Sequence, residues 1–172
     1  VSVLISADTT DDVEVHARPG LAVRDSAGGE PVVLPDNGAS RWRVAVAPNG
    51  RNRVSFRTDH WRRWRDLDGE GELSAGGQPI TLVTPSGDRA YRGRLRAVAV
   101  RAGSAERDTV NILSMDNYLR GVVPLEIPAS WSTEAVRAQA VAARTFAAYE
   151  RADAGSARYQ LCDTTSCQVY GG

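Results

Sequence analysis

Short runs of alternating apolar and polar residues fill the first third of the chain. A period of two is typical of strands that bury one face and expose the other. Gly, Pro, Asn and Asp lie between the runs and favour tight turns, so we expect antiparallel strands. The runs span residues 1–5, 13–17, 21–25, 31–34, 41–46 and 53–57.

The alternation stops at His60-Trp61-Arg62-Arg63-Trp64-Arg65. This segment is either a solvated loop whose tryptophans cover the edge of the β core, or a site where aromatic and guanidinium groups hold a base, a phosphate or a sugar. Four acids follow and would neutralise the arginines locally and repel a polyanion, which disfavours nucleic acid. These acids are Asp66, Asp68, Glu70 and Glu72.

Strand character returns in three further runs, at residues 80–84, 91–100 and 109–113. We expect the last two to pair through the turn at Gly103-Ser104. A soft boundary falls between Arg65 and Gly77. The division that we predict is a β-rich N-terminal region over residues 1–70 and a second region over residues 71–172.

A short helix is expected after Ser114, which suits an N-cap, and it should end near Gly121. Pro124 and Pro128 then flank Glu126. Because proline fixes φ and lacks a backbone donor, we expect a stiff, non-helical connection that holds this one carboxylate in place. Rigid placement is what a catalytic acid requires, so Glu126 is our first candidate for a catalytic residue.

The strongest helical pattern covers residues 133–152, with Ser132 as its cap and Gly155-Ser156 at its end. Alanine and other apolar residues occur on nearly all sides, which predicts a helix buried by several neighbours. Arg144 lies in its middle and, if buried, needs a partner. The predicted fold class is therefore α+β, with antiparallel strands first and then a catalytic region built round a buried Ala-rich helix.

Composition narrows the class of protein further. The 172 residues are 42% hydrophobic and 24% charged, which is ordinary for a globular protein. The net charge is zero, which argues against a protein dedicated to nucleic acid. All 21 basic residues are arginine. Neither a membrane-spanning apolar stretch nor a signal segment is present in this sequence, so we expect an export signal to have been removed or left out.

Two cysteines, Cys162 and Cys167, lie five positions apart in a polar, turn-rich tail. A small disulfide loop in an oxidising compartment is the first interpretation. Two free thiols and half of a zinc site remain as alternatives, although His16 and His60 are far away in the sequence. We therefore expect no cofactor, with zinc as the minority interpretation.

Three ordered motifs in the second half resemble the SpoIID/LytB family, the stage II sporulation protein D family of peptidoglycan lytic transglycosylases. Together they extend over about 55 residues, which makes them more specific than a single short motif. The motifs are Tyr118-Leu119-x-Gly121-Val122-Val123-Pro124-x-Glu126-x-Pro128-x-x-Trp131, Ala135-x-x-Ala138-Gln139-Ala140-Val141-Ala142-Ala143-Arg144-Thr145-Phe146-Ala147 and Cys167-Gln168-Val169-Tyr170-x-Gly172.

This resemblance implies cleavage of peptidoglycan glycan strands between N-acetylmuramic acid and N-acetylglucosamine, with a 1,6-anhydro product. The acid of the family motif falls on Glu126. A single acid suffices because the 6-hydroxyl of the sugar is the internal nucleophile. Motif residues that would bind substrate or support the acid are Trp131, Gln139, Arg144, Gln168 and Tyr170; the alternative is that they support the helix and the tail structurally.

Two other functions remain open. Relatives in the family are amidase modifiers, so the chain would alternatively be a non-catalytic cell-wall binding protein that acts on an N-acetylmuramoyl-L-alanine amidase. A two-carboxylate hydrolase with Asp116 or Asp163 as the second acid is the third possibility. The resemblance also implies a secreted or envelope location, and further strands beyond Gly172, so that we expect the catalytic region to be truncated.

Overall fold

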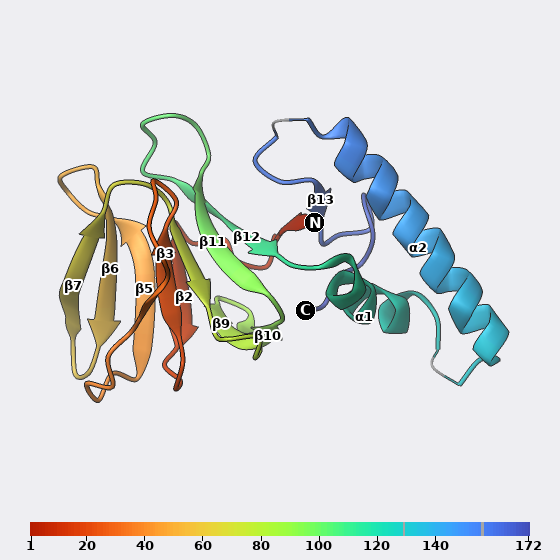
Figure 1. The fold of residues 1–172 in the computed structure, drawn as a ribbon, viewed down its shortest axis with the longest axis horizontal. Helices are drawn as coiled ribbons and strands as arrows, with labels where there is room; N and C mark the ends of the chain where they lie inside the picture. Colours follow the sequence, from red (N-terminus) through yellow and green to blue (C-terminus); the bar gives the residue numbers. More distant parts are fainter. Residues whose placement is uncertain (129, 156) are drawn as a thin grey trace.

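The computed structural model describes residues 1–128, 130–155 and 157–172. In these residues, thirteen strands form two mostly antiparallel sheets, and two helices lie in the C-terminal half. The α+β class predicted from the sequence is confirmed. Figure 1 shows the strands β2 (Asp12–His16), β5 (Arg41–Val46), β6 (Asn52–Arg57) and β7 (Trp61–Leu67) at one end of the molecule and the helices α1 (Met115–Glu126) and α2 (Thr133–Asp153) at the other.

The first sheet has seven strands within the described part of the chain, in the order β13-β1-β12-β11-β8-β3-β4. β1 pairs with β13 in parallel, and the other pairs are antiparallel. The predicted hairpin is confirmed, because β11 pairs with β12 across the turn at residues 100–106. The strands are β1 (Ser2–Leu4), β3 (Ala22–Asp25), β4 (Val32–Val33), β8 (Gly71–Ser74), β11 (Arg94–Ala99), β12 (Arg107–Ile112) and β13 (Leu161–Cys162).

Strands from both sides of the expected boundary near residue 70 share this sheet. The N-terminal strand β1 lies between β12 and β13, which come from the second half of the chain. The division into residues 1–70 and 71–172 stays a prediction.

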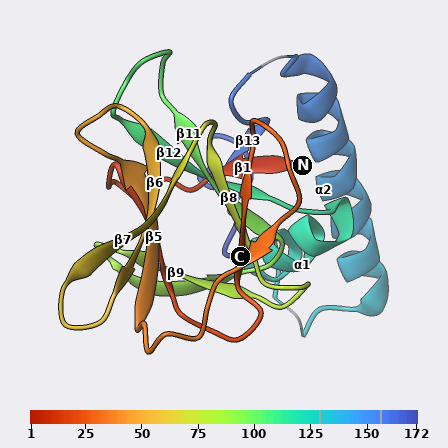
Figure 2. The same ribbon diagram turned by 60° about the vertical axis from the view of Figure 1, so that its left-hand side comes forward.

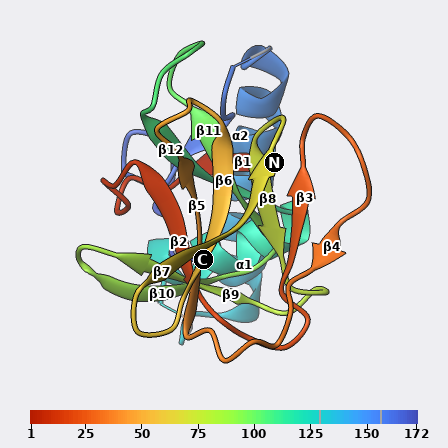
Figure 3. The ribbon, with the colours of Figure 1, turned by 90° about the vertical axis from the view of Figure 1, so that its left-hand side faces the viewer.

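The second sheet has six strands among the described residues, in the order β10-β9-β2-β5-β6-β7, and every pair is antiparallel. Figure 3 views the molecule from the end of this sheet at which β7 lies. The strands are β2 (Asp12–His16), β5 (Arg41–Val46), β6 (Asn52–Arg57), β7 (Trp61–Leu67), β9 (Ile80–Thr84) and β10 (Gly87–Tyr91).

The segment expected as a solvated loop around Trp61 is instead the edge strand β7. A register shift between Val54 and Ser55 on the neighbouring strand changes the phase of the pairing, so no simple alternation is visible in the sequence. The expected role of the tryptophans holds for Trp64, whose ring meets the edge of Trp42 at a centroid distance of 5.7 Å.

One hydrophobic core joins the two sheets and the helices. Val13 and Val44 from one sheet and Leu73 from the other have no exposed surface, and they belong to the same cluster as Tyr118 of α1 and Ala143 of α2. Figure 2 shows α1 lying between the ends of the strands and α2. The core therefore reaches from the β end of the molecule to the helices that carry the first and second motifs.

Helix α1 continues through Pro124 to Glu126, so the expectation that this proline excludes a helix was wrong. Ser114 caps the helix as predicted, because its side chain accepts the N–H of Asn117. Pro124 lies in the last turn, where its missing N–H removes one intrahelical hydrogen bond. Burial of Val122 on the preceding turn and the N–H of Ile127, which donates to the carbonyl of Val123, keep this turn helical.

Helix α2 is not the buried central helix that the sequence predicted. Of its described residues only Ala143 and Ala147 are buried, while the side chains of Val141 and Tyr149 are mostly exposed. Alanine contributes so little apolar area that a pattern of alanines on all sides does not require neighbours on all sides. The cap at Ser132 is confirmed, and the predicted end at Ser156 lies outside the described residues.

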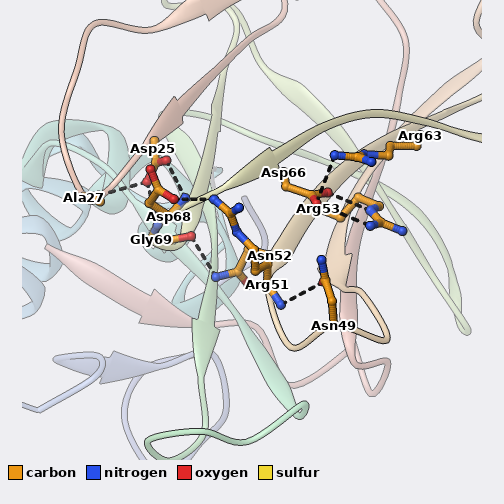
Figure 4. A network of polar contacts seen from close by, with 10 residues as sticks. All are labelled: Asp25, Ala27, Asn49, Arg51, Asn52, Arg53, Arg63, Asp66, Asp68 and Gly69. Atoms are coloured by element: carbon orange, nitrogen blue, oxygen red, sulfur yellow. Dashed lines mark hydrogen bonds and ion pairs between the residues drawn. The ribbon is translucent and has the colours of Figure 1, made fainter.

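A polar network ties the two sheets together at one end (Figure 4). The carboxylate of Asp25, on β3, accepts the backbone N–H groups of Ala27, Asp68 and Gly69 at 2.8 to 3.0 Å. Asn52, on β6, donates to the carbonyl of Gly69 at 2.7 Å. Desolvation acts to raise the pKa of Asp25, but the three N–H donors outweigh it and hold the pKa below its usual value.

Candidate active site

A pocket of about 360 Å³ brings together three segments that the motifs single out. The end of α1 supplies the carboxylate, α2 supplies an apolar wall, and the disulfide loop with the following residues supplies the third side. The residues that line the pocket are Glu126, Ala142, Phe146, Thr165, Cys167, Gln168 and Val169.

Glu126 is the last residue of α1, and its side chain is exposed to the pocket. Its Oε1 atom accepts the backbone N–H of Val169 at 3.1 Å, across 43 positions of sequence. A backbone donor fixes a carboxylate without adding a charge beside it. The acid is therefore oriented by the end of helix α1 and by residues 168–172, which we call the tail.

The tail is seated on α1 because residue 121 is glycine. A Cβ atom at Gly121 would lie 2.5 Å from the ring of Tyr170 and 2.9 Å from the carbonyl oxygen of Gly172. The carbonyl of Gly121 accepts the N–H of Gly171 at 3.1 Å. Gly121 of the first motif therefore has a structural role: without a side chain at this position, α1 and the tail can approach closely.

Two stacked tyrosines, one from α1 and one from the tail, join these two segments. The rings of Tyr118 and Tyr170 lie 5.4 Å apart at 23°, and both side chains are buried. The hydroxyl of Tyr170 donates to Asn111 at 2.6 Å, and that of Tyr118 donates to Gln168 at 3.0 Å. Burial raises the pKa of both tyrosines, and for Tyr118 the negative charge of Glu126 raises it further. Both hydroxyls therefore remain protonated donors.

The disulfide loop is closed by its own bond and is also held by hydrogen bonds from the N-terminal segment. Cys162 and Cys167 form a disulfide bond, the first of the alternatives expected from their spacing. Asp163 within the loop is nearly buried, and its carboxylate accepts the N–H and the hydroxyl of Ser6 at 3.1 and 2.6 Å. The N-terminal strand therefore helps to place the loop that carries Gln168 and Val169.

No group of three or more His, Cys, Asp or Glu side chains is arranged to hold a metal ion in residues 1–128, 130–155 and 157–172. The disulfide uses both thiols that the zinc alternative would need. The donor set at this loop therefore does not fit a zinc ion in the disulfide form of the chain.

The predicted site residues fall into three groups. Glu126 and Gln168 line the pocket, and Tyr170, in the tail, is buried against Tyr118 of α1. Arg144 is exposed, so the burial that would have required a partner is absent; it still forms an ion pair with Asp116 of α1 at 2.5 Å. Trp131 is 57% exposed, and neither it nor Gln139 lines this pocket. The catalytic and binding roles stay predictions.

Two contributors to the pocket were not predicted from the sequence. Val169 acts through its backbone N–H, which has no side-chain signature. Thr165 lies in the disulfide loop and belongs to none of the quoted motifs. Phe146 and Ala142 were within the second motif, but only the packing of α2 shows that they form one wall.

A larger pocket of about 570 Å³ lies elsewhere, between residues 17–20 and 33–39 and over Trp42. It contains none of the predicted site residues. Its charged lining groups are Arg18 and Asp36, and Arg18 already donates to the backbone carbonyl of Pro79. We place the candidate chemistry in the smaller pocket, because that is where a helix end, a carboxylate and a fixed backbone donor meet.

The fold and the pocket define a mixed α+β protein with one carboxylate set between two helices and a disulfide loop. Residues 103–172 match the family model described as "SpoIID: Stage II sporulation protein". The resemblance to the SpoIID/LytB family that the motifs indicate is thereby confirmed for this part of the chain.

Two relatives are each similar to a part of the sequence. An uncharacterized protein of Brachyspira hyodysenteriae (strain ATCC 49526 / WA1) is 44% identical over 64 residues, which are 37% of this chain and 17% of that protein. The "Amidase enhancer" of Bacillus subtilis (strain 168) is 54% identical over 54 residues, which are 31% of this chain and 7% of that protein. The chain thus spans only a small share of either relative.

No solved structure matches the chain significantly. Neither described helix is long and apolar enough to cross a membrane.

Proposed function

We propose that this chain acts on the glycan strands of cell-wall peptidoglycan as a lytic transglycosylase. The bond cleaved joins N-acetylmuramic acid to N-acetylglucosamine, and the product carries a 1,6-anhydro ring. Glu126 is the acid and base of the reaction. The match of residues 103–172 to the SpoIID family supports a role at the cell wall, and the pocket supports the reaction type.

One observation carries the proposal: among the described residues that line the pocket, Glu126 is the single acid. A conventional glycoside hydrolase uses two carboxylates on either side of the scissile bond. A transglycosylase needs one, since the substrate supplies its own nucleophile. A pocket with one fixed carboxylate and an apolar wall is consistent with the second chemistry.

The proposed mechanism has two proton transfers at one carboxyl group. Glu126 in its acid form first donates a proton to the glycosidic oxygen, and the bond to C1 of the muramic acid breaks. The 6-hydroxyl of the same sugar then attacks C1, and the Glu126 carboxylate takes the hydroxyl proton. The acid form is restored, and no water is consumed.

The neighbours of Glu126 support these steps. The N–H of Val169 donates to Oε1 and so stabilises the carboxylate that forms after the first transfer. Gln168 accepts the Tyr118 hydroxyl through its oxygen, which leaves its amide hydrogens to donate to a sugar hydroxyl or acetamido oxygen. Phe146 provides an apolar surface for a sugar ring.

The hydrolase alternative has less support. Asp163 is nearly buried and occupied by two donors from Ser6, and Asp116 forms an ion pair with Arg144. Neither aspartate lines the pocket. A second carboxylate that accepts its hydrogen bonds elsewhere is poorly placed to activate water.

A second candidate function comes from the printed name of one relative, "Amidase enhancer". In this function the chain binds peptidoglycan without cleaving it and modifies an N-acetylmuramoyl-L-alanine amidase. Either function places the chain outside the cell or in the envelope, and the disulfide favours such an oxidising location. We propose peptidoglycan as the partner in both, with no nucleic acid.

The decisive experiment compares Glu126→Gln with the unaltered chain on purified glycan strands freed of stem peptides. We expect the variant to lose about 10²- to 10⁴-fold of the rate at which anhydro-muramic acid appears in mass spectrometry, because general acid–base catalysis contributes about that much. Glu134→Gln is the matched control, because Glu134 is an exposed acid on α2 outside the pocket.

Other outcomes would select the alternatives. A reducing-end product without the anhydro ring would show a hydrolase. No turnover by either chain, together with equal stimulation of an amidase on intact sacculi, would show the enhancer function.

A further inference from the structure

Residues 41–67, which form β5, β6 and β7, carry a large excess of positive charge. They contain eight arginines and two aspartates and no other charged residue, which gives a net charge of +6 with His60 neutral. The whole chain has a net charge of zero, so the remaining residues carry −6. Figure 1 places these strands at the opposite end of the molecule from α2 and from α1, whose last residue is Glu126.

Five of these arginines lie on the solvent side of the three strands. The residues between them, such as Trp42, Val44 and Val54, are buried in the core, and alternation turns their neighbours outward. We call this surface the arginine face; its members are Arg41, Arg43, Arg53, Arg57 and Arg63, with Trp61 at the edge. Figure 3 shows β5, β6 and β7 on the side of the molecule that faces the viewer.

The arginine face contains a pairing that costs stability. Arg41 and Arg57 lie directly opposite each other on β5 and β6. Like charges at such positions are unfavourable. Glu14 partly compensates Arg41 at 2.6 Å, but no carboxylate among the described residues forms an ion pair with Arg57. A costly arrangement without a structural partner favours a role in binding.

Three of the four acidic residues that follow in the sequence do not neutralise this face, contrary to the expectation from their proximity. Glu72 is buried on β8 and binds Arg94 and Arg96 of the other sheet. Glu70 accepts the N–H of Ala99, also on the other sheet. Asp68 pairs with Arg51 at the turn, away from the centre of the face.

Asp66 is the one acid of that tract that lies beside the face, and it orders two of the arginines. Its side chain is 7% exposed and holds Arg53 at 2.7 Å and Arg63 at 3.1 Å (Figure 4). The hydrogen bond from Arg53, with the charges of Arg53 and Arg63, holds the pKa of Asp66 below its usual value. Arg53 is partly buried and Arg63 is exposed. Asp12 pairs with Arg43 at 3.4 Å and Glu14 with Arg41, so three acids face five arginines and the surface keeps a net positive charge.

A pocket of about 230 Å³ lies within the arginine face. Its lining includes Arg43, Arg53, Arg62 and Arg63, with Ser55 and Trp61. The guanidinium of Arg43 stacks over the ring of Trp61 at 4.1 Å, which restricts its orientation. Guanidinium groups held in fixed directions match the oxygens of a phosphate group.

We propose that the arginine face binds a phosphate-bearing polymer, with one phosphate in the pocket and neighbouring phosphates along β5 to β7. Charge complementarity selects a polyanion over a neutral glycan. Proteins that bind single-stranded nucleic acid stack successive bases on several aromatic rings. Trp61 is covered on one side by Arg43, and Trp64 packs against Trp42, so the described face offers no such series of rings. The polymer is therefore one without bases.

The test measures binding of inorganic polyphosphate as a function of salt concentration. We expect the chain to bind it and the affinity to fall as salt rises, because phosphate contacts release counterions. The double variant Arg57→Gln, Arg63→Gln should reduce the slope of log affinity against log salt by about 2, roughly 100-fold weaker binding at 0.1 M salt. Both side chains are exposed, so the variant should keep its melting temperature.

The control is Arg101→Gln, which removes an exposed arginine from the turn between β11 and β12. Equal affinity of the control and the double variant would overturn the proposal. Tighter binding of single-stranded DNA with the same number of phosphates would replace the proposed ligand with nucleic acid. Glu126→Gln should bind polyphosphate as the unaltered chain does, so failure of the glycan-cleavage proposal leaves this one standing.

Discussion

The two ends of the molecule differ in how their residues are fixed. At the β end, alternate side chains such as Val13, Val15 and Val44 have no exposed surface, and cross-strand pairing places every neighbour. At the helical end, α2 buries Ala143 and Ala147 among its described residues and exposes most of the rest. The β end is stabilised by alternating buried side chains on several strands, and the helical end by a narrow stripe and a few specific contacts.

The candidate site lies at the end with the thinner core, and long-range contacts compensate for this. The tail binds α1 through Gly171 and Gly121, and its Val169 binds Glu126. Tyr170 anchors it further to Asn111 of β12. A site built this way depends on a small number of contacts, so single substitutions should affect it selectively while the β end remains intact.

The largest effect on stability should come from the β end. Leu82→Ala, on β9, removes a side chain with no exposed surface and should lower the free energy of unfolding by about 2–5 kcal/mol. Val141→Ala, on the exposed side of α2, should change it by less than about 0.5 kcal/mol. Urea unfolding followed by circular dichroism measures both. Similar losses for the two variants would show that α2 is covered in solution. The contrast between a well-buried β end and an exposed helical end would then be wrong.

A smaller effect is expected where the tail meets α1. Gly121→Ala forces a methyl group to within 2.5 Å of the Tyr170 ring, and the resulting shift should cost about 1–3 kcal/mol. The amides of Val169 and Gly171 should exchange hydrogen faster, while those of β5 and β6 should not. Arg120→Ala, one residue away and exposed, serves as the control. Unchanged exchange at Val169 would mean that the tail is held without this close contact.

The smallest effect concerns the polar network at the β end. The pKa of Asp25 is held below its usual value of 3.8 in the folded chain, so its ionised form stabilises the fold above that value. This stabilisation is lost as the pH falls through the folded pKa. Asp25→Asn should therefore lower the melting temperature most near neutral pH, for a cost of about 0.5–1.5 kcal/mol. A difference from the unaltered chain that persists at pH 2 would rule out ionisation as the cause.

The sequence predicted the β end well because its information is local. Period-two runs gave β2, β5, β6 and β9, and the turn at Gly103-Ser104 gave the β11–β12 hairpin. The edge strand β7 escaped prediction because a register shift and adjacent arginines hide its alternation. The caps Ser114 and Ser132 were also readable, since a helix start depends on one side chain and the next turn.

The helical end was predicted in its parts but not in its packing. The local rule that proline stops a helix failed at Pro124, because burial of α1 and its last-turn hydrogen bond hold that segment helical. The rule that apolar residues on all sides imply burial failed for α2, because alanine methyls bury little area. The acids after β7 were expected to neutralise its arginines, but most of them turn to other partners.

The sequence by itself determined the α+β class, the two helix starts and Glu126 as the candidate acid. Tertiary structure alone decided that this acid meets the N–H of Val169, that Gly121 makes room for Tyr170, and that the arginines of β5 to β7 share one face. The physical reason is the separation along the sequence of the residues that interact. Alternation, caps and turns depend on neighbours within a few positions, whereas these contacts join residues up to tens of positions apart that only the folded chain brings together.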